Sequence, residues 1–243
     1  VTTGIISNNY THGTKGWVLE QGDMTFTGNT WGTVALGNPN VYDIAILSGV
    51  NAAYYTDVPA MSGANNNAFI EDQRYSPARL TPVYVNASAP ACTDCGTARM
   101  PYQTIQAGID RAIAGGTVHV AAGTYNEGIT LNKPNITVRS IAGAASTIID
   151  VPAASLTTGV TIVKDMGTVT FEGFTVQSFT ESGIIQGMSQ SSGTTAIIKN
   201  NVVTPASNYL RNGIQVTGNG SIVEGNTVNG ARLTEDWAST GIS

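Results

Sequence analysis

The chain has 243 residues, only 11% of which are charged, and its formal net charge at pH 7 is −5. A chain of this length can bury a substantial core, and it is long enough for one large all-β domain. The excess of acidic residues argues against nucleic acid as a partner, since nucleic-acid binding needs a basic face. No apolar run approaches the roughly 20 residues of a membrane helix, so the sequence predicts no membrane span.

Composition also favours an extracellular β-rich protein. The chain contains 32 Thr, 28 Gly and 20 Asn, and a surface of hydroxyls and amides rather than Lys and Glu is common in extracellular β-solenoids. The sequence opens at Val1, without an initiator Met or a signal peptide. We therefore expect the chain to be processed, or to be an excerpt of something longer.

Residues 1–36 look like the middle or the end of a stack of coils. They contain a short motif twice, as GIISNNYT at residues 4–11 and MTFTGNTWG at residues 24–32: an apolar strand residue, a Gly/Asn or Asn/Asn corner, and another apolar residue. The motif returns at residues 171–176, 197–203 and 222–228. Parallel coils stack equivalent positions about 4.8 Å apart, so corner side chains can form a ladder of amide hydrogen bonds. The candidates for this ladder are Asn9, Asn29, Asn201 and Asn226.

The spacing of the motif predicts a head-to-tail array. Asn9 and Asn29 are 20 residues apart, and Asn226 follows Asn201 by 25. If a second copy followed directly, its Asn9 would come 26 residues after Asn226, so the rhythm would continue across the joint. The alternative is that short Asn-rich motifs recur in any β-helix and that the match is chance. In an array joined covalently or non-covalently, the expected interface residues are Ile5, Ile6, Trp17, Val18, Met24, Phe26, Ile214, Ile222 and Ile242.

Between residues 37 and 82 the coil rhythm stops. This segment holds four of the nine prolines and one good strand candidate, at residues 42–47. A purely flexible linker would not carry Ile44, Ile46 and Phe69. We therefore expect residues 37–82 to be an ordered connector between the coils of residues 1–36 and a second stack at residues 83–243.

Cys92 and Cys95 form a CxxC motif that can be a redox or metal half-site, a local disulfide or two free thiols. A zinc site needs four ligands, and only His12 and His119 remain to supply imidazole, neither at a suitable spacing. A thioredoxin-like role would need a βαβ context, which the sequence lacks. We expect a structural disulfide, which would imply an oxidising, extracytoplasmic compartment.

Residues 101–114 predict one short amphipathic helix. Ile105 and Ile109 lie at helical spacing, Pro101 can occupy the first turn, and Gly115 follows the last. Beyond it, short runs of Thr, Val and Ile are stopped by Gly, Asn or Pro, which is typical of strands with tight corners. One helix followed by many short strands indicates a cap on a stack of coils.

The runs TIQAGIDRA at residues 104–112 and GGTVHVAAGTY at residues 115–125 resemble the opening of the pectin-lyase-like superfamily. The resemblance implies an all-β fold, a right-handed parallel β-helix or solenoid with one short N-terminal capping α-helix. It extends more loosely, as coil rhythm, over most of the remaining chain. It implies little about function, because this fold carries lyases, hydrolases, esterases, adhesins and inert shafts.

The sequence contains no recognisable group of catalytic residues. Polygalacturonase-like catalysis needs clustered acidic residues, and the chain contains no adjacent Asp pair. Pectate-lyase chemistry needs several Asp for calcium and a nearby Arg base. The best candidates are Asp150, Asp165 and Arg139, which are more often solvated surface. We expect no catalytic residue, no cofactor and no metal site, and we keep a secreted polysaccharide lyase or hydrolase as the alternative.

Binding to carbohydrate is a further alternative, since Tyr10, Trp17, Trp31 and Trp237 could stack on sugar rings. Four sequons, at Asn9, Asn86, Asn135 and Asn219, permit glycosylation. The sequence thus predicts an extracellular or cell-surface structural module of a head-to-tail β-helix array, in a fibre, a sheath or an adhesin stalk. Its expected partners are copies of itself, with surface glycans as further candidates.

Overall fold

The computed structural model describes residues 3–11, 15–31, 42–92, 95–152, 157–186, 193–206, 212–230 and 240–242. It confirms the expected all-β fold with parallel sheets, and it contains two short helices among the described residues. None of the described helices is long and apolar enough to span a membrane.

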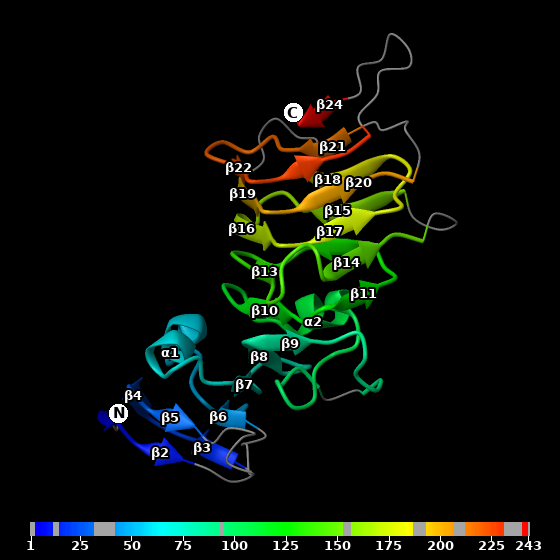
Figure 1. Ribbon diagram of the computed structural model, residues 1–243. Coiled ribbons are helices and arrows are strands. Elements are labelled where there is room, and N and C mark those ends of the chain that lie inside the picture. The colour runs from blue at the N-terminus through cyan, green and yellow to red at the C-terminus, as the bar shows by residue number, and fades with distance from the viewer. Residues whose placement is uncertain are drawn as a thin grey trace.

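From Val83 onward the chain forms a stack of coils with three sides, each side a parallel sheet (Figure 1). The first side contains β9 (Val83–Val85), β10 (Thr117–Val120), β13 (Thr137–Ser140), β16 (Gly167–Glu172), β19 (Thr194–Lys199) and β22 (Ile222–Glu224). The second contains β11 (Gly123–Tyr125), β14 (Thr147–Asp150), β17 (Thr175–Gln177), β20 (Val202–Thr204) and β23 (Thr227–Val228). The third contains β12 (Ile129–Leu131), β15 (Thr158–Ile162), β18 (Ser182–Gln186), β21 (Asn212–Gln215) and β24 (Thr240–Ile242). We call this part the large stack.

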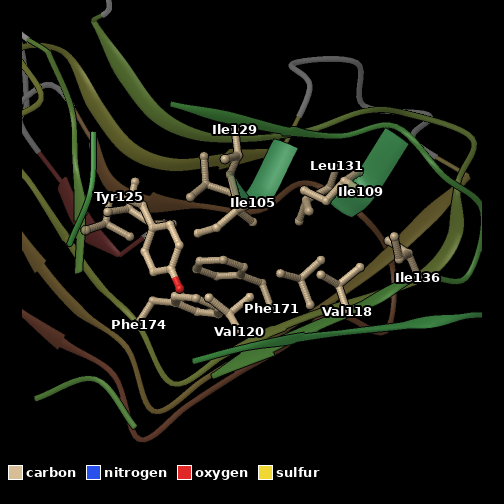
Figure 2. Close-up of a cluster of buried hydrophobic side chains, with 14 of the residues drawn as sticks. Ile105, Ile109, Val118, Val120, Tyr125, Ile129, Leu131, Ile136, Phe171 and Phe174 are labelled. Carbon is tan, nitrogen blue, oxygen red and sulfur yellow. The ribbon is translucent and has the colours of Figure 1, made fainter. Parts of the chain in front are cut away.

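The core of the large stack follows from alternation along each strand, since successive side chains of a strand point to opposite faces. On the first side, Val118, Val138 and Phe171 are in register and fully buried, and Ile198 continues the row. Phe171 stacks on Phe174 with 4.6 Å between ring centroids. In Figure 2, Val118 and Phe171 of the first side meet Tyr125 of the second side and Ile129 and Leu131 of the third side in the interior. Each such burial stabilises the fold by about 1.5–3 kcal/mol.

The first residues form a second, smaller stack of two coils. β1 (Thr3–Ser7), β2 (Tyr10–Thr11) and β3 (Lys15–Leu19) make the first coil, and β4 (Asp23–Thr27), β5 (Thr30–Trp31) and β6 (Tyr42–Ile46) make the second. The strands pair in parallel as β1 with β4, β2 with β5 and β3 with β6. We call these two coils the small stack.

β6 lies inside the range 37–82 that the sequence suggested as a connector. Its residues Ile44 and Ile46 are fully buried in the core of the small stack, so β6 is the third strand of the second coil. That coil therefore extends to Ile46, beyond the boundary expected at residue 36.

The rest of the connector joins the two stacks. It contains α1 (Val58–Ala64), β7 (Ile70–Asp72) and β8 (Arg79–Thr81), and the sheet runs in the order β3-β6-β7-β8 with β7 and β8 antiparallel. Leu80 of β8 forms a bridge with Ala112, in the large stack. Side chains also cross over, because Ile113 packs in the small-stack core and Phe69 packs against the large-stack core. Figure 1 shows the two stacks arranged one beyond the other, with β7 and β8 between them.

Helix α2 (Ile105–Arg111) is shorter than the helix expected over residues 101–114. Tyr102 instead bridges to Val85, and Ala112 already has extended backbone and bridges to Leu80. The helix packs its buried residues Ile105 and Ile109 into the large-stack core. Figure 2 places these two side chains beside those of β12.

The Glu127 carboxylate accepts hydrogen bonds from the backbone N–H groups of Ile105 (2.7 Å) and Gln106 (3.0 Å) at the start of α2. Burial raises the pKa of Glu127 above its ordinary value of 4.5, although these two hydrogen bonds act in the opposite direction. A raised pKa means that the folded chain binds this proton more tightly than the unfolded chain does. Its contribution to stability is therefore largest below the ordinary pKa and is lost as the pH rises through the folded pKa.

We expect the wild-type chain to gain stability over a Glu127→Gln variant as the pH falls from neutral toward the ordinary Glu pKa, because the variant does not titrate at this position. Urea denaturation of both proteins at a series of pH values measures the difference. A difference in the free energy of unfolding that stays constant over this range would contradict the expectation.

Candidate assembly surface

The coils of the small stack and the last coils of the large stack share one corner geometry. An inward apolar residue is followed, three positions later, by the corner asparagine: Ile6 by Asn9, Phe26 by Asn29, Ile198 by Asn201 and Val223 by Asn226. The residue before each asparagine has a left-handed backbone, with φ of 54° at Asn8, 65° at Gly28, 55° at Asn200 and 66° at Gly225. Asn and Gly are the residues that adopt this conformation most readily. The corner then leads directly into a two- or three-residue strand on the second side.

In the small stack the corner amides are hydrogen-bonded from coil to coil. The backbone N–H and the Nδ2 of Asn9 both donate to Oδ1 of Asn29, at 3.0 and 3.1 Å. Asn29 donates in the same way to Oδ1 of Asn65, which follows α1, at 3.4 and 2.8 Å. Asn29 and Asn65 are fully buried. Asn65 is a member of this ladder that sequence reasoning missed, because it lies next to a helix and not in a coil motif.

The large stack repeats the arrangement. The backbone N–H and Nδ2 of Asn201 donate to Oδ1 of Asn226, at 2.9 and 3.0 Å. One coil earlier the corner position is occupied by Phe174, whose backbone N–H donates to Oδ1 of the buried Asn201 at 2.9 Å. The structure thus brings Asn9 together with Asn29, and Asn201 together with Asn226, in two separate ladders.

The other residues expected at an interface divide by the face of the strand they occupy. Phe26 and Ile214 are buried inside their own stacks, and Ile6, Trp17 and Met24 are half-buried. Ile5, Val18 and Ile222 are 75%, 41% and 43% exposed. Ile5 and Ile222 lie on the outer face, because they neighbour the inward residues Ile6 and Val223 and strands alternate. Ile242 belongs to β24, and its side chain lies outside the described residues.

Two polar atoms of the first coil lack a hydrogen-bond partner in the described part of the chain, although both are buried. They are Oγ1 of Thr11 and Nε1 of Trp17. A buried polar atom without a partner costs about 1–3 kcal/mol, so this coil has hydrogen-bonding capacity that its own stack does not use.

The structure joins Cys92 and Cys95 in a disulfide with 6.0 Å between their Cα atoms. Cys95 is buried and belongs to the large-stack core, whereas Cys92 is exposed. The bridge pins the loop between β9 and α2 to that core.

The four sequon asparagines differ in how their side chains are used. Asn219 is exposed, and Asn9 is exposed but hydrogen-bonded to Asn29. Oδ1 of Asn86 accepts from the N–H of Ser88 at 2.9 Å, and Oδ1 of Asn135 accepts from the N–H of Thr168 at 2.8 Å.

The residues considered for catalysis lie at different places on the coils. Arg139 pairs with Glu172 on the outer face of the first side, at 3.3 Å. Asp150 ends β14 on the second side, and Oδ1 of Asp165 accepts from the N–H of Gly193 at 3.3 Å. His12, weighed above as a zinc ligand, and Trp237, weighed as a sugar-stacking residue, lie outside the described residues. Among the described residues, no group of three His, Cys, Asp or Glu could hold a metal ion.

Sequence reasoning missed a row of side chains on the outer face of the first side. Successive strands place the following residues in register: Tyr84, His119, Arg139, Glu172, Lys199 and Glu224. The Tyr84 and His119 rings stack at 5.3 Å, and Lys199 pairs with Glu224 at 2.9 Å. Burial, and then the charge of Arg139, lower the pKa of His119. Each of these residues points outward from its strand, but coils of unequal length conceal their alignment in the sequence.

Two hollows of about 280 and 290 Å³ lie at the junction of the two stacks, and Tyr75 and Ile113 line both. Arg79 and Lys133 line the first, and the Arg79 guanidinium lies 5.6 Å from the centre of the Tyr75 ring.

A search of protein-family models, curated proteins and solved structures finds no match to this chain.

Proposed function

We propose that the chain is an extracellular structural module of a head-to-tail array of right-handed parallel β-helices, as in a surface fibre, sheath or adhesin stalk. In this array the first coil of one copy (β1–β3) stacks on the last coil of another (β22–β24). The observation that supports it best is that these two coils are built on one plan. Each has an inward apolar residue, a left-handed residue, a corner asparagine and a two-residue strand, at the same spacing.

The equivalence extends to the burial of neighbouring positions. Counting from the corner asparagines, the inward residue Val223 corresponds to Ile6, and the half-buried Val228 corresponds to Thr11. On the outer face, the exposed Ile222 corresponds to the exposed Ile5. Stacking one coil on the other would place these residues in adjacent rungs, about 4.8 Å apart. Ile222 and Ile5 would then cover each other, next to Ile197, which is already paired with Ile222.

The driving force is the one that holds coils together within a stack. The edge of an outermost strand exposes unpaired backbone N–H and C=O groups, and solenoids gain their stability from burial between neighbouring coils. The joint would cover the half-buried Ile6 on one copy and Val223 on the other. Removing their apolar surface from water stabilises the contact by about 25 cal/mol per Å². The contact is the same whether one polypeptide carries several copies or separate chains associate.

The proposed location rests on two further features. The Cys92–Cys95 disulfide fits an oxidising compartment. The chain is also poor in charge and rich in Thr and Asn, as the sequence shows.

Sedimentation velocity over a range of concentrations tests the array. We expect the wild-type chain to form open-ended oligomers that grow with concentration, and we expect Ile6→Asp to abolish them, because the inward position at the joint would then hold an unpaired charge. Ile141→Asp is the matched control, since Ile141 is 62% exposed on the flank of the large stack. A wild-type chain that stays monomeric at its highest soluble concentration, or oligomers that persist in the Ile6→Asp variant, would contradict the proposal.

A further inference from the structure

We propose that the corner asparagines of two adjoining copies form one continuous ladder, and that this ladder fixes the register and the direction in which copies join. The inference rests on the proposed head-to-tail array. It adds the polar contacts that select one relative position of the two copies among those that apolar burial alone would allow.

A complete rung has three hydrogen bonds, as Asn29 and Asn201 show. Two donors, the backbone N–H and Nδ2, point forward to Oδ1 of the next asparagine. Nδ2 also donates backward, to the carbonyl of the inward residue one coil earlier. For Asn29 this is the carbonyl of Ile6 at 2.9 Å, and for Asn201 it is that of Phe171 at 3.2 Å. The ladder is therefore directional, with donors on the earlier coil and acceptors on the later one.

The two outermost asparagines each lack one half of this set. Asn9 has its forward bonds to Asn29, but its Nδ2 donates to the carbonyl of its own neighbour Ser7 at 3.0 Å. Oδ1 of Asn9 accepts no hydrogen bond in the described part of the chain. Asn226 has its backward bond, to the carbonyl of Ile198 at 2.7 Å, whereas its backbone N–H finds no acceptor among the described residues. An open acceptor thus lies on the first coil and open donors lie on the last.

Joining the two coils completes both sets. The N–H and Nδ2 of Asn226 would donate to Oδ1 of Asn9 in the next copy, and Nδ2 of that Asn9 would turn from Ser7 to the carbonyl of Val223. The resulting ladder contains Asn201, Asn226, Asn9, Asn29 and Asn65. Its ends are closed inside single copies, by the N–H of Phe174 at one end and, at the other, by the carbonyls of Phe26 and Met61 that accept from Nδ2 of Asn65. Among the described residues of the ladder, the unmatched donors and the unmatched acceptor all lie at the joint.

The ladder would reject the misalignments that the apolar pattern tolerates. A shift of one residue turns Ile6 to the outer face, so burial alone excludes it. A shift of two residues keeps the inward faces inward, but it places Ser7 or Thr11 opposite Asn226 and leaves the amide donors unmatched. If the last coils of two copies met, the amide donors of Asn226 in one copy would face those of Asn226 in the other, and neither would find an acceptor. Since a buried donor without an acceptor is costly, one register and one direction remain.

Two measurements test the ladder separately from the array. Asn9→Ala removes the acceptor at the joint, while inside its own copy it removes only the side-chain bonds of an exposed outermost residue. We expect association to weaken by roughly ten- to a hundred-fold. Asn132→Ala is the matched control, because Asn132 is an exposed asparagine on the large stack, away from both ladders, and it should associate as the wild type does. The second measurement is hydrogen exchange, in which the backbone amide of Asn226 should exchange rapidly in the monomer and become protected on assembly.

The outcomes separate the two proposals. If the wild-type chain does not assemble, the array itself is wrong. If it assembles and Ile6→Asp abolishes assembly, but Asn9→Ala behaves like Asn132→Ala, the array stands and the ladder across the joint is overturned. An Asn226 amide that exchanges as fast in the assembly as in the monomer would also overturn it.

Discussion

Replacing Asp72 with Ala is expected to lower the free energy of unfolding by about 3–5 kcal/mol, because it removes one partner of a buried ion pair. The Asp72 side chain is 1% exposed, and its carboxylate binds Nε and Nη2 of Arg74 in two parallel hydrogen bonds of 2.8 and 2.7 Å. The same guanidinium donates to the backbone carbonyls of Tyr54 (2.7 Å) and Tyr55 (3.2 Å). The hydrogen bond to Asp72, more than any other contact, raises the pKa of Arg74. The variant loses this contact, but an Arg guanidinium is not deprotonated in proteins, so its buried charge would be left without a partner.

The Asp72–Arg74 pair links the segment before α1, which contains Tyr54 and Tyr55, to β7, the strand that leads from the small stack to the large one. Urea denaturation of Asp72→Ala measures the loss, and limited proteolysis between residues 48 and 57 locates it. Glu71→Ala is the control, because Glu71 is the only half-buried residue of β7 and points away from the core between two buried neighbours; it should change stability by no more than about 0.5 kcal/mol. A loss below about 1 kcal/mol in Asp72→Ala would mean that the ion pair does not hold the junction.

Replacing Phe171 with Ala is expected to cost about 3–5 kcal/mol, the range for deleting a buried aromatic ring. Phe171 is fully buried in the middle of the first side, in register with Val138 on one coil and Ile198 on the next. Its ring also stacks on Phe174 with an interplanar angle of 11°. The cavity would open between coils that each depend on their neighbours for burial.

Thermal and urea unfolding, followed by circular dichroism, measure this loss. Phe171→Leu should cost distinctly less, since it restores part of the lost volume. Ile141→Ala, at an exposed position, should stay within about 0.5 kcal/mol of the wild type. A Phe171→Ala variant no less stable than Phe171→Leu would mean that the interior repacks freely and that the row on the first side is not a fixed core.

Much of the fold could be predicted because its signals are local. Alternating apolar residues with Gly and Asn corners identified most of the strands, and the corner motif identified both pairs of stacked asparagines. The third strand of the second coil was harder to place, since residues 32–41 separate it from β5 and interrupt the spacing. Once Ile44 and Ile46 are seen to be buried beside Trp17 and Leu19, the two-coil stack is complete.

Other features could not be predicted, because they depend on contacts between distant segments. Asn65 joins the ladder only because α1 brings it beside Asn29, 36 residues away in sequence. The role of Asp72 and Arg74 depends on the carbonyls of Tyr54 and Tyr55, which no local pattern places nearby. Strand alternation, by contrast, does predict that Ile5 and Ile6 lie on opposite faces of β1. It thus assigns different positions to two neighbouring isoleucines.

The one-way direction of the asparagine ladder bears on how long an assembly can become. A contact between unlike ends cannot close into a two-fold dimer, and it produces an open filament unless the rotation between copies happens to close a ring. Such a contact sets no limit on the number of copies in the filament, because each added copy again exposes a free end. Length would then depend on supply and on terminators. The simplest terminator is a copy without its first coil, because it can join a filament through its last coil but then offers no first coil to the next copy.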